Sequence, residues 1–200
     1  GYTGSPTMVE VSEVEWEGLK YAVTSVGNGA FYASRSLTSV SLPNVTMVED
    51  DAFGICECLA SVSLPNATTI GGAAFWSCIQ LTEVSLPSAT TIGGYAFDSC
   101  RVLASVALPK VTTIGNYAFF QCPLTDVSLP SATMIGENAF NGCSKLTSVS
   151  LPKVIGIGKD AFIRCDTLST LCVNGLVKSV IEANGRGTFG LSGGVAITDS

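Results

Sequence analysis

The sequence predicts a mainly-β solenoid, a rod built from stacked right-handed coils of about 22 residues each. The first observation is a leucine that recurs at a nearly constant spacing, at Leu37, Leu59, Leu81, Leu103, Leu124, Leu146 and Leu168. The copy from Leu103 to Leu124 is one residue shorter than the others. A fixed period in this range indicates structural repeats that stack on one another.

Two other side chains recur with the same period. A phenylalanine column comprises Phe31, Phe53, Phe75, Phe97, Phe119, Phe140 and Phe162, and a cysteine column comprises Cys56, Cys78, Cys100, Cys122, Cys143 and Cys165. One copy is too short to bury its own apolar side chains, so each must pack against its neighbours. About eight coils at roughly 4.8 Å would give one domain on the order of 35–40 Å long.

Each copy contains three segments, which are clear in the residues that follow Leu81. The motif L-x-x-V-x-L-P places Val84 and Leu86 on one face of a strand and Ser85 on the other, and the proline ends the strand. These strands are expected to form an inner parallel sheet. A short second strand follows around Thr90 to Ile92, and a helical or 3-10 turn holds the phenylalanine and the cysteine, which are three residues apart.

The combined pattern L-x-x-V-x-L-P, T-x-I-G-x-x-A-F-x-x-C resembles the BspA-like leucine-rich repeats of surface proteins from host-associated microbes, over roughly residues 19–173. The chain departs from the usual copy, which is about one residue longer after the proline. The resemblance implies a leucine-rich-repeat solenoid and a secreted or cell-surface location. It also implies adhesion or binding to a partner, either a host extracellular or mucosal protein or a surface glycan.

The period is lost at both ends of the chain. Residues 1–22 are expected to form a β-hairpin cap that turns at Glu17-Gly18 and covers the first coil, with a loose end at residues 1–7. The repeats extend over residues 23–173. Residues 174–200 are expected to form a C-terminal cap, with a helix over 176–183 and a strand over 195–198. The first residues lack a signal-peptide pattern, so the sequence is expected to have been trimmed at its start.

Composition argues against several classes of function. The net charge is −6 and there is no basic stripe, which makes nucleic acid an improbable partner. No run of about 18 apolar residues is present, so no membrane insertion is expected. Histidine is absent, which removes Ser-His and Cys-His catalysis and a common metal ligand. We therefore expect no enzyme activity, no catalytic residues, no bound metal and no cofactor, in a chain that is a monomer.

The eight cysteines suggest disulfides, but their positions favour free thiols. Six lie in one column, where copies in register direct their Cβ atoms the same way, whereas a disulfide needs converging Cβ vectors. Cys58 and Cys172 lie outside the column, and a disulfide at either remains open. The run Glu49-Asp50-Asp51 is interpreted as a solvated turn because it lacks the spaced oxygen ligands of a calcium loop.

Two surfaces are candidates for binding. Large aromatic residues replace Gly, Asp or Asn on the turns at Trp76, Tyr95, Tyr117 and Phe120, which predicts a contact patch, although the rings could simply pack on one another between coils. The alternative surface is the outer strand face, represented by Ser63, Glu83, Ser85, Ser105, Asp126 and Ser128. Small side chains there could also reflect close strand packing. The sequence thus predicts a non-enzymatic protein-binding or adhesion module, with a structural spacer of a larger exported protein as the alternative.

Overall fold

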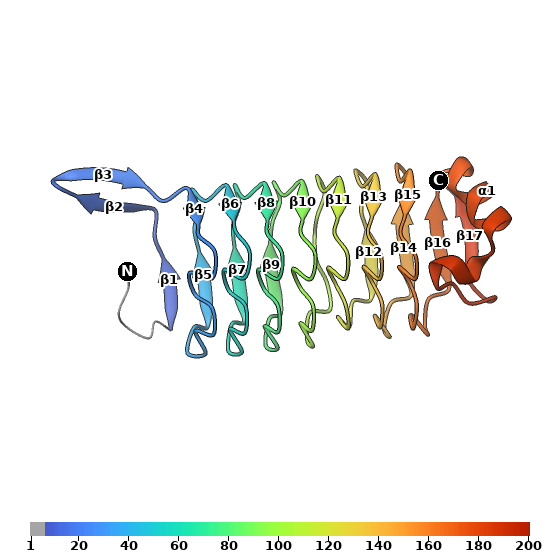
Figure 1. Ribbon diagram of the computed structural model, residues 1–200, viewed down its shortest axis with the longest axis horizontal. Helices are drawn as coiled ribbons and strands as arrows, with labels where there is room; N and C mark the ends of the chain where they lie inside the picture. Colours follow the sequence, from blue (N-terminus) through green and yellow to red (C-terminus); the bar gives the residue numbers. More distant parts are fainter. Residues whose placement is uncertain (1–6) are drawn as a thin grey trace.

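Two short parallel strands and a set of tight turns make up each coil, and the coils stack into a rod (Figure 1). The computed structural model describes residues 7–200, so the loose end expected for residues 1–7 lies almost entirely outside the described residues. The architecture confirms the solenoid of parallel strands that the 22-residue period predicts.

The first strands of the coils, most of which lead into a Leu-Pro pair, form two separate parallel sheets together with a strand from each end of the chain. Their members are β1 (Met8–Glu10), β5 (Ser39–Ser41), β7 (Ser61–Ser63) and β9 (Glu83–Ser85) in one sheet, and β12 (Asp126–Ser128), β14 (Ser148–Leu151), β16 (Thr170–Val173) and β17 (Ala196–Asp199) in the other. Between them, residues 105–107 make one isolated bridge, from Ser85 to Ala107. The inner sheet is therefore interrupted in the coil that is one residue short.

The second strand of each coil belongs to a seven-stranded parallel sheet that has no such break. Its strands are β4 (Ser25–Val26), β6 (Met47–Val48), β8 (Thr69–Ile70), β10 (Thr91–Ile92), β11 (Thr113–Ile114), β13 (Met134–Ile135) and β15 (Gly156–Ile157). Just before these strands, threonine hydroxyls donate to the threonine carbonyl of the preceding coil, as Thr90 does to Thr68 at 3.1 Å. These bonds add a side-chain link between coils to the backbone pairing.

The third segment of each coil takes the form of consecutive hydrogen-bonded turns. In the coil of Phe97, the amide of Asp98 donates to the carbonyl of Tyr95 at 3.0 Å and the amide of Cys100 donates to that of Phe97 at 3.2 Å. Two residues here, Tyr95 and Ser99, have φ values of 59° and 60°. Left-handed residues interrupt a helix, so the segment forms two separate turns and does not continue as a helix.

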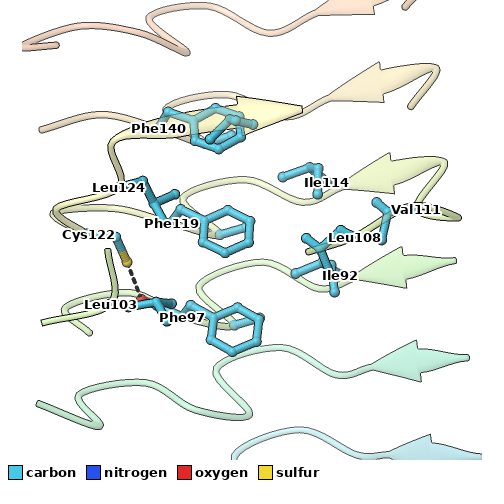
Figure 2. Packing of buried hydrophobic residues seen from close by; sticks show 14 of the residues in the cluster. Ile92, Phe97, Leu103, Leu108, Val111, Ile114, Phe119, Cys122, Leu124 and Phe140 are labelled. Atoms are coloured by element: carbon cyan, nitrogen blue, oxygen red, sulfur yellow. Dashed lines mark hydrogen bonds between the residues drawn. The ribbon is translucent and has the colours of Figure 1, made fainter. Parts of the chain in front are cut away.

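The core lies between these segments and contains the two predicted columns together with buried leucine, valine, isoleucine and alanine side chains (Figure 2). Neighbouring phenylalanine rings stack nearly parallel, with centroids 5.1–5.6 Å apart. The six column cysteines are buried free thiols, and each donates to the phenylalanine carbonyl of the preceding coil, as Cys122 does to Phe97 at 2.9 Å. The thiols therefore link coils as well as filling space.

A glycine after the isoleucine of the second strand, in most coils, sets the approach of one coil to the next. A Cβ atom on Gly115 would lie 2.5 Å from the backbone nitrogen of Gly94, and the same close contact occurs at Gly71, Gly93, Gly136 and Gly158. No left-handed backbone is involved, because the φ angles of these glycines are not positive. These residues are glycine because adjacent backbones leave no room for a side chain.

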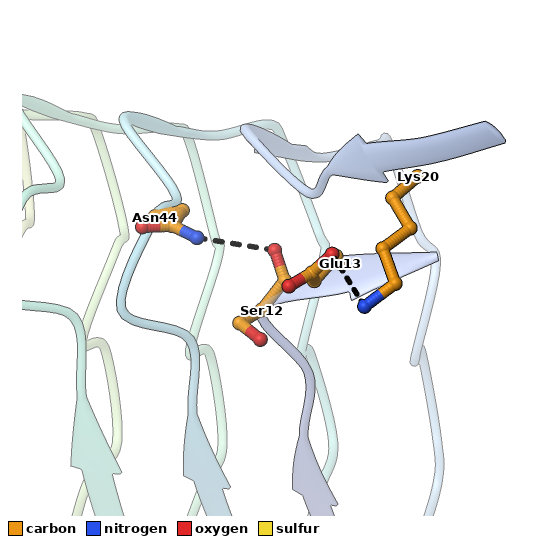
Figure 3. Close-up of polar contacts among 4 residues, drawn as sticks. All are labelled: Ser12, Glu13, Lys20 and Asn44. Atoms are coloured by element: carbon orange, nitrogen blue, oxygen red, sulfur yellow. Dashed lines mark hydrogen bonds and ion pairs between the residues drawn. The ribbon is translucent and has the colours of Figure 1, made fainter. Parts of the chain in front are cut away.

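The N-terminal end differs from the expected cap. Strand β1 pairs in parallel with β5 and extends the inner sheet, whereas β2 (Glu13–Trp16) and β3 (Leu19–Ala22) form an antiparallel hairpin that projects beyond the rod (Figure 1). Every residue of β3 is exposed, so the hairpin does not cover the first coil. Lys20 pairs with Glu13 at 3.6 Å within the hairpin, and the Asn44 amide donates to the Ser12 carbonyl at 3.1 Å, which links the start of the hairpin to a repeat coil (Figure 3).

The C-terminal end is covered by helix and strand. Asn174 caps the N-terminus of helix α1 (Gly175–Asn184), because its side-chain oxygen accepts a hydrogen bond from the amide of Val177 at 3.0 Å. The helix buries Val177 and Ile181. A 3-10 helix, η1 (Arg186–Phe189), follows. Strand β17 then pairs in parallel with β16 and adds a last strand to the inner sheet.

Candidate functional site

Three of the four candidate aromatic residues form a contiguous cluster on the turns. The rings of Tyr95 and Tyr117 stack with centroids 4.8 Å apart and planes 3° apart. Phe120 packs edge-on against Tyr117, with centroids 5.8 Å apart and planes 60° apart. We call Tyr95, Tyr117 and Phe120 the aromatic cluster.

The fourth residue, Trp76, is not part of these ring contacts. The stacking of the phenylalanine column puts the residues after Phe75, Phe97 and Phe119 at equivalent places on successive coils, so Asp98 lies between Trp76 and Phe120. Of the ring contacts found in residues 7–200, none includes Trp76. The predicted patch of four residues is thus a cluster of three with a separate, half-buried tryptophan.

Asp98 is a residue of this surface that the sequence reasoning missed. Partial burial raises the pKa of its carboxyl group, and a hydrogen bond from the Ser99 hydroxyl to Asp98 Oδ1, 2.8 Å long, opposes that rise. The sequence contained a signal for this position, because Asp98 lies 22 residues from both Trp76 and Phe120. The surface therefore has an acidic group between its aromatic residues.

Backbone conformation gives the two tyrosines no advantage at their positions. Tyr95 and Tyr117 have φ values of 59° and 58°, in the left-handed region. That conformation costs an ordinary residue about 1–2 kcal/mol, and Gly, Asn and Asp adopt it most readily. The equivalent residues of other coils are Gly29, Asp51, Ala73, Asn138 and Asp160. A tyrosine is thus placed where local conformation favours other residues.

The cluster is accessible from solvent. The side chain of Tyr95 is 46% exposed, and Tyr117 and Phe120 are half-buried. Stacking on Tyr117 covers one side of Tyr95, so the rings pack on one another between coils while Tyr95 stays partly exposed.

Five residues of the alternative surface lie on the outer face of inner-sheet strands and Ser105 lies in the interrupted coil, and all six line two shallow grooves. Ser63, Glu83, Ser85 and Ser105 line a groove of about 490 Å³. Asp126 and Ser128 line a second groove of about 440 Å³, and the break in the inner sheet at residues 106–107 borders both. This surface has no large aromatic side chain among its lining residues.

Asp126 is the acidic residue with the most hydrogen bonds on this face. The hydroxyls of Ser148 and Thr147 donate to its Oδ1 at 2.6 and 3.0 Å, and these bonds lower the pKa of the carboxyl group. Its negative charge is thus held in place by two hydroxyl groups of the next coil.

The acidic run near the N-terminus has a local structural role. Glu49 Oε2 accepts from the amide of Asn28 at 3.0 Å, and Asp50 Oδ1 accepts from the amide of Gly72 at 2.6 Å, so each carboxylate binds a turn of an adjacent coil. Across residues 7–200, no three His, Cys, Asp or Glu side chains come close enough together to hold a metal ion. In the same part of the chain, no helix is long and apolar enough to cross a membrane.

Comparison with known proteins gives consistent results at the level of family and fold. The profile of the BspA-type leucine-rich repeat region, with six copies, matches residues 24–132 and 68–184. A leucine-rich cell surface protein from Faecalibacterium prausnitzii A2-165 is 24% identical over 86% of this chain, with a TM-score of 0.61. This chain covers 65% of the length of that protein.

A second solved structure covers a larger part of both chains. The T. pallidum leucine-rich repeat protein is 26% identical over 96% of this chain and 89% of its own length, with a TM-score of 0.57. A search of curated proteins found no match. The repeat pattern, the stacked coils and the profile match over most of the sequence agree: the chain belongs to the BspA-type leucine-rich repeat family.

Proposed function

We propose that the chain is a non-enzymatic, surface-exposed protein-binding or adhesion module of a host-associated microbe, and that the aromatic cluster is the centre of its contact surface. The observation that supports this most strongly is the occurrence of two tyrosines at left-handed positions. Stacking of the aromatic pair contributes about 0.5–1.5 kcal/mol, which is less than the roughly 2–4 kcal/mol that two left-handed residues cost together. Folding alone therefore gives little reason for the tyrosines.

Aromatic side chains are suited to a contact role. Residues such as Tyr and Trp contribute most of the binding energy in many protein interfaces, and they lose little conformational freedom when they bind. The stacked pair of Tyr95 and Tyr117 is already ordered by the fold. Asp98, next to the cluster, would favour a partner with a basic group at the matching place.

Similarity supports the proposed location. The F. prausnitzii protein that shares the fold is described as a cell surface protein. We extend that location to this chain, as a secreted or surface-attached monomer. Its partner would be a host extracellular or mucosal protein.

A binding screen with a fold-neutral variant tests the proposal. The wild-type chain is tested by biolayer interferometry against immobilised extracellular-matrix and mucosal proteins. The Tyr95→Asn/Tyr117→Asn variant keeps residues that suit the left-handed backbone, as Asn138 does in its own coil. It should melt at about the wild-type temperature and bind at least tenfold more weakly, because it loses two aromatic anchors. Equal binding by the variant would exclude the aromatic cluster.

A second pair of variants compares the two surfaces directly. The double variant Trp76→Ala/Phe120→Ala should weaken binding of a partner found in the screen by about 2 kcal/mol or more. Glu83→Ala with Asp126→Ala, on the strand face, should change little. The reverse result would assign binding to the strand face. Separate Trp76→Ala and Phe120→Ala variants would show whether the isolated tryptophan belongs to the same contact.

The alternative function is a structural spacer within a larger exported protein. The close packing of the aromatic rings on one another favours it, because those contacts also stabilise stacked coils. A spacer predicts that the wild-type chain binds none of the immobilised proteins. It also predicts that the Tyr95→Asn/Tyr117→Asn variant changes stability alone.

A further inference from the structure

A polar groove crosses four consecutive coils where each phenylalanine turn leads into the next coil. Its volume is about 420 Å³ and its lining is mainly polar. Arg101 comes from the first of these coils and Arg164 from the fourth. The groove is separate from the aromatic cluster and from the strand face.

Two departures from the repeat coincide at this groove. Between Cys122 and Leu124 there is only Pro123, whereas the other coils have two residues between the column cysteine and the next leucine. In the following coil, Gly142 occupies the position that is Gln121 and Arg164 in the adjacent coils. A missing residue and a missing side chain thus lower the surface on neighbouring coils. A Cβ on Gly142 would lie 3.3 Å from Cγ of Gln121, so even a small side chain would begin to fill the space.

The arginines of the groove are available to a ligand. Arg35 occupies the same position in its coil as Arg101, and it pairs with Glu57 of the next coil at 3.5 Å. For Arg101, the position that corresponds to Glu57 in the next coil is Pro123, which has no carboxylate to pair with the arginine. No ion pair found in residues 7–200 includes Arg101 or Arg164. With Asp166, the lining has two positive charges and one negative charge.

The remaining lining groups suit a ligand with many hydroxyls. Gln121, Asn141 and Ser144 provide amide and hydroxyl groups that can donate and accept. Asn141 donates to Asn138 Oδ1 at 2.9 Å, while its own Oδ1 is buried and accepts no hydrogen bond. Guanidinium groups bind carboxylates with strong, directional hydrogen bonds.

We propose that this groove binds an acidic carbohydrate, a sugar that bears a carboxylate such as a uronic or sialic acid. Arg101 and Arg164, at opposite ends of the groove, are the two places where a carboxylate binds, and the amide and hydroxyl groups between them contact the sugar hydroxyls. The sparse apolar lining and the small volume favour a sugar over a peptide, whose side chains would need apolar contacts. This site does not depend on the proposed protein contact at the aromatic cluster.

The first test is a titration of the whole chain followed by protein NMR. Sialyllactose and tetragalacturonate are the acidic probes, maltotetraose is the neutral sugar, and a tetraglutamate peptide presents carboxylates without a sugar. At least one acidic probe should shift the resonances of Gln121, Asn141 and Ser144 in a saturable way. Maltotetraose and tetraglutamate should bind at least about tenfold more weakly, since each lacks one of the two recognised features. Failure of both acidic sugars, or equal binding of either control, would overturn the proposal.

Matched variants locate the site. Arg101→Ala, and Arg164→Asn at its left-handed position, should each weaken the acidic sugar by about tenfold or more. Arg35→Ala removes an arginine at the same place in another coil, and it should leave binding unchanged. If Arg35→Ala weakened binding as much as Arg101→Ala, general charge and not the groove would be responsible.

An insertion tests the shape of the site without removing a charge. Serine inserted between Pro123 and Leu124 restores the usual spacing, and it should reduce affinity although both arginines remain. Unchanged affinity in a folded insertion variant would contradict a role for the shortened coil. The Tyr95→Asn/Tyr117→Asn variant should bind the sugar normally, which separates this result from that of the protein-binding test.

Discussion

Phe97 illustrates how a single side chain supports two interfaces of the rod. It is fully buried, and its ring stacks on Phe75 at 5.2 Å and on Phe119 at 5.3 Å. Each internal phenylalanine of the column has two such neighbours, whereas Phe31, in the first coil, stacks on Phe53 alone and is only partly buried. The cost of losing a ring therefore depends on its place in the column.

Replacement of Phe97 by alanine should lower the free energy of unfolding by about 3–5 kcal/mol, because it removes a buried ring and leaves a cavity that both neighbours line. Urea denaturation followed by circular dichroism measures the effect. Phe31→Ala is the matched control and should cost less, since one side of its ring has no neighbour in the column. A loss below about 1 kcal/mol for Phe97→Ala would contradict its role in the core.

The column thiols should be shielded from reagents in the native protein. Burial raises the pKa of Cys56 to about 11 and that of Cys165 to about 12, so these thiols are not ionised at neutral pH. Ellman's reagent should therefore react with the exposed Cys58 and more slowly with the half-buried Cys172. The six column thiols should react only after denaturant is added. Rapid reaction of all eight without denaturant would contradict this packing.

The close spacing of adjacent coils depends on glycine residues. Gly115→Ala should destabilise the protein by about 1–3 kcal/mol, because the added methyl group meets the backbone of Gly94 and Gly93. Gly27→Ala is the matched control, since a Cβ at Gly27 would have no other atom within 4 Å. Thermal unfolding measures both variants.

Equal stability of the Gly115→Ala and Gly27→Ala proteins would show that the coils can move apart to admit a methyl group. Glu49 occupies the equivalent position of the second coil and is accommodated there. The coil of Glu49 stacks on the coil of Gly27, and the strand of the Gly27 coil lies at the edge of the seven-stranded sheet. Internal coils lack this freedom because neighbours hold them on both sides.

The sequence predicted the elements that depend on periodicity. Val62 and Leu64 alternate with serine in the manner of a strand, and the phenylalanine and cysteine columns were expected in the core, where the structure places them. It did not predict the break at Ala107 or the direction of the β2–β3 hairpin. Those depend on how a backbone meets its neighbour across coils, which residue type alone does not encode.

The candidate site was also predicted only in part. The 22-residue spacing placed Tyr95 and Tyr117 on adjacent coils, and their rings do stack. It did not separate Trp76 from the aromatic cluster, since the intervening Asp98 becomes evident only when three coils are aligned. Left-handed backbone at the tyrosines was also hidden, because neighbouring coils hold it there against the preference of the residue.

The whole rod should lose stability at alkaline pH because buried thiols such as Cys56 and Cys165 ionise only after unfolding. Burial raises the folded pKa values of Cys56 and Cys165 to about 11 and about 12, so the stability that these protonated thiols provide is complete below about pH 8.5 and is lost as the pH rises toward 11 or 12. Each such thiol contributes a slope of about 1.4 kcal/mol per pH unit in that range. Urea denaturation at several pH values measures the slope. It should decrease in Cys78→Ala and stay unchanged in Cys58→Ala, and a constant free energy of unfolding from pH 8 to 11 would contradict the expectation.

The glycine contacts between coils have a consequence for how the gene can change. Because Gly71, Gly93, Gly115 and their equivalents hold each coil at one separation from its neighbour, coils are interchangeable, and recombination between the similar DNA segments that encode them can lengthen or shorten the rod without a new fold. The short coil that ends at Pro123 is distinct, since it occurs once. A duplication between Tyr117 and Asn141 would separate Arg101 from Asn141 and Arg164 and so divide the polar groove, whereas a duplication nearer the N-terminus would leave the groove intact. A single recombination event can therefore lengthen the rod and either keep or divide this surface.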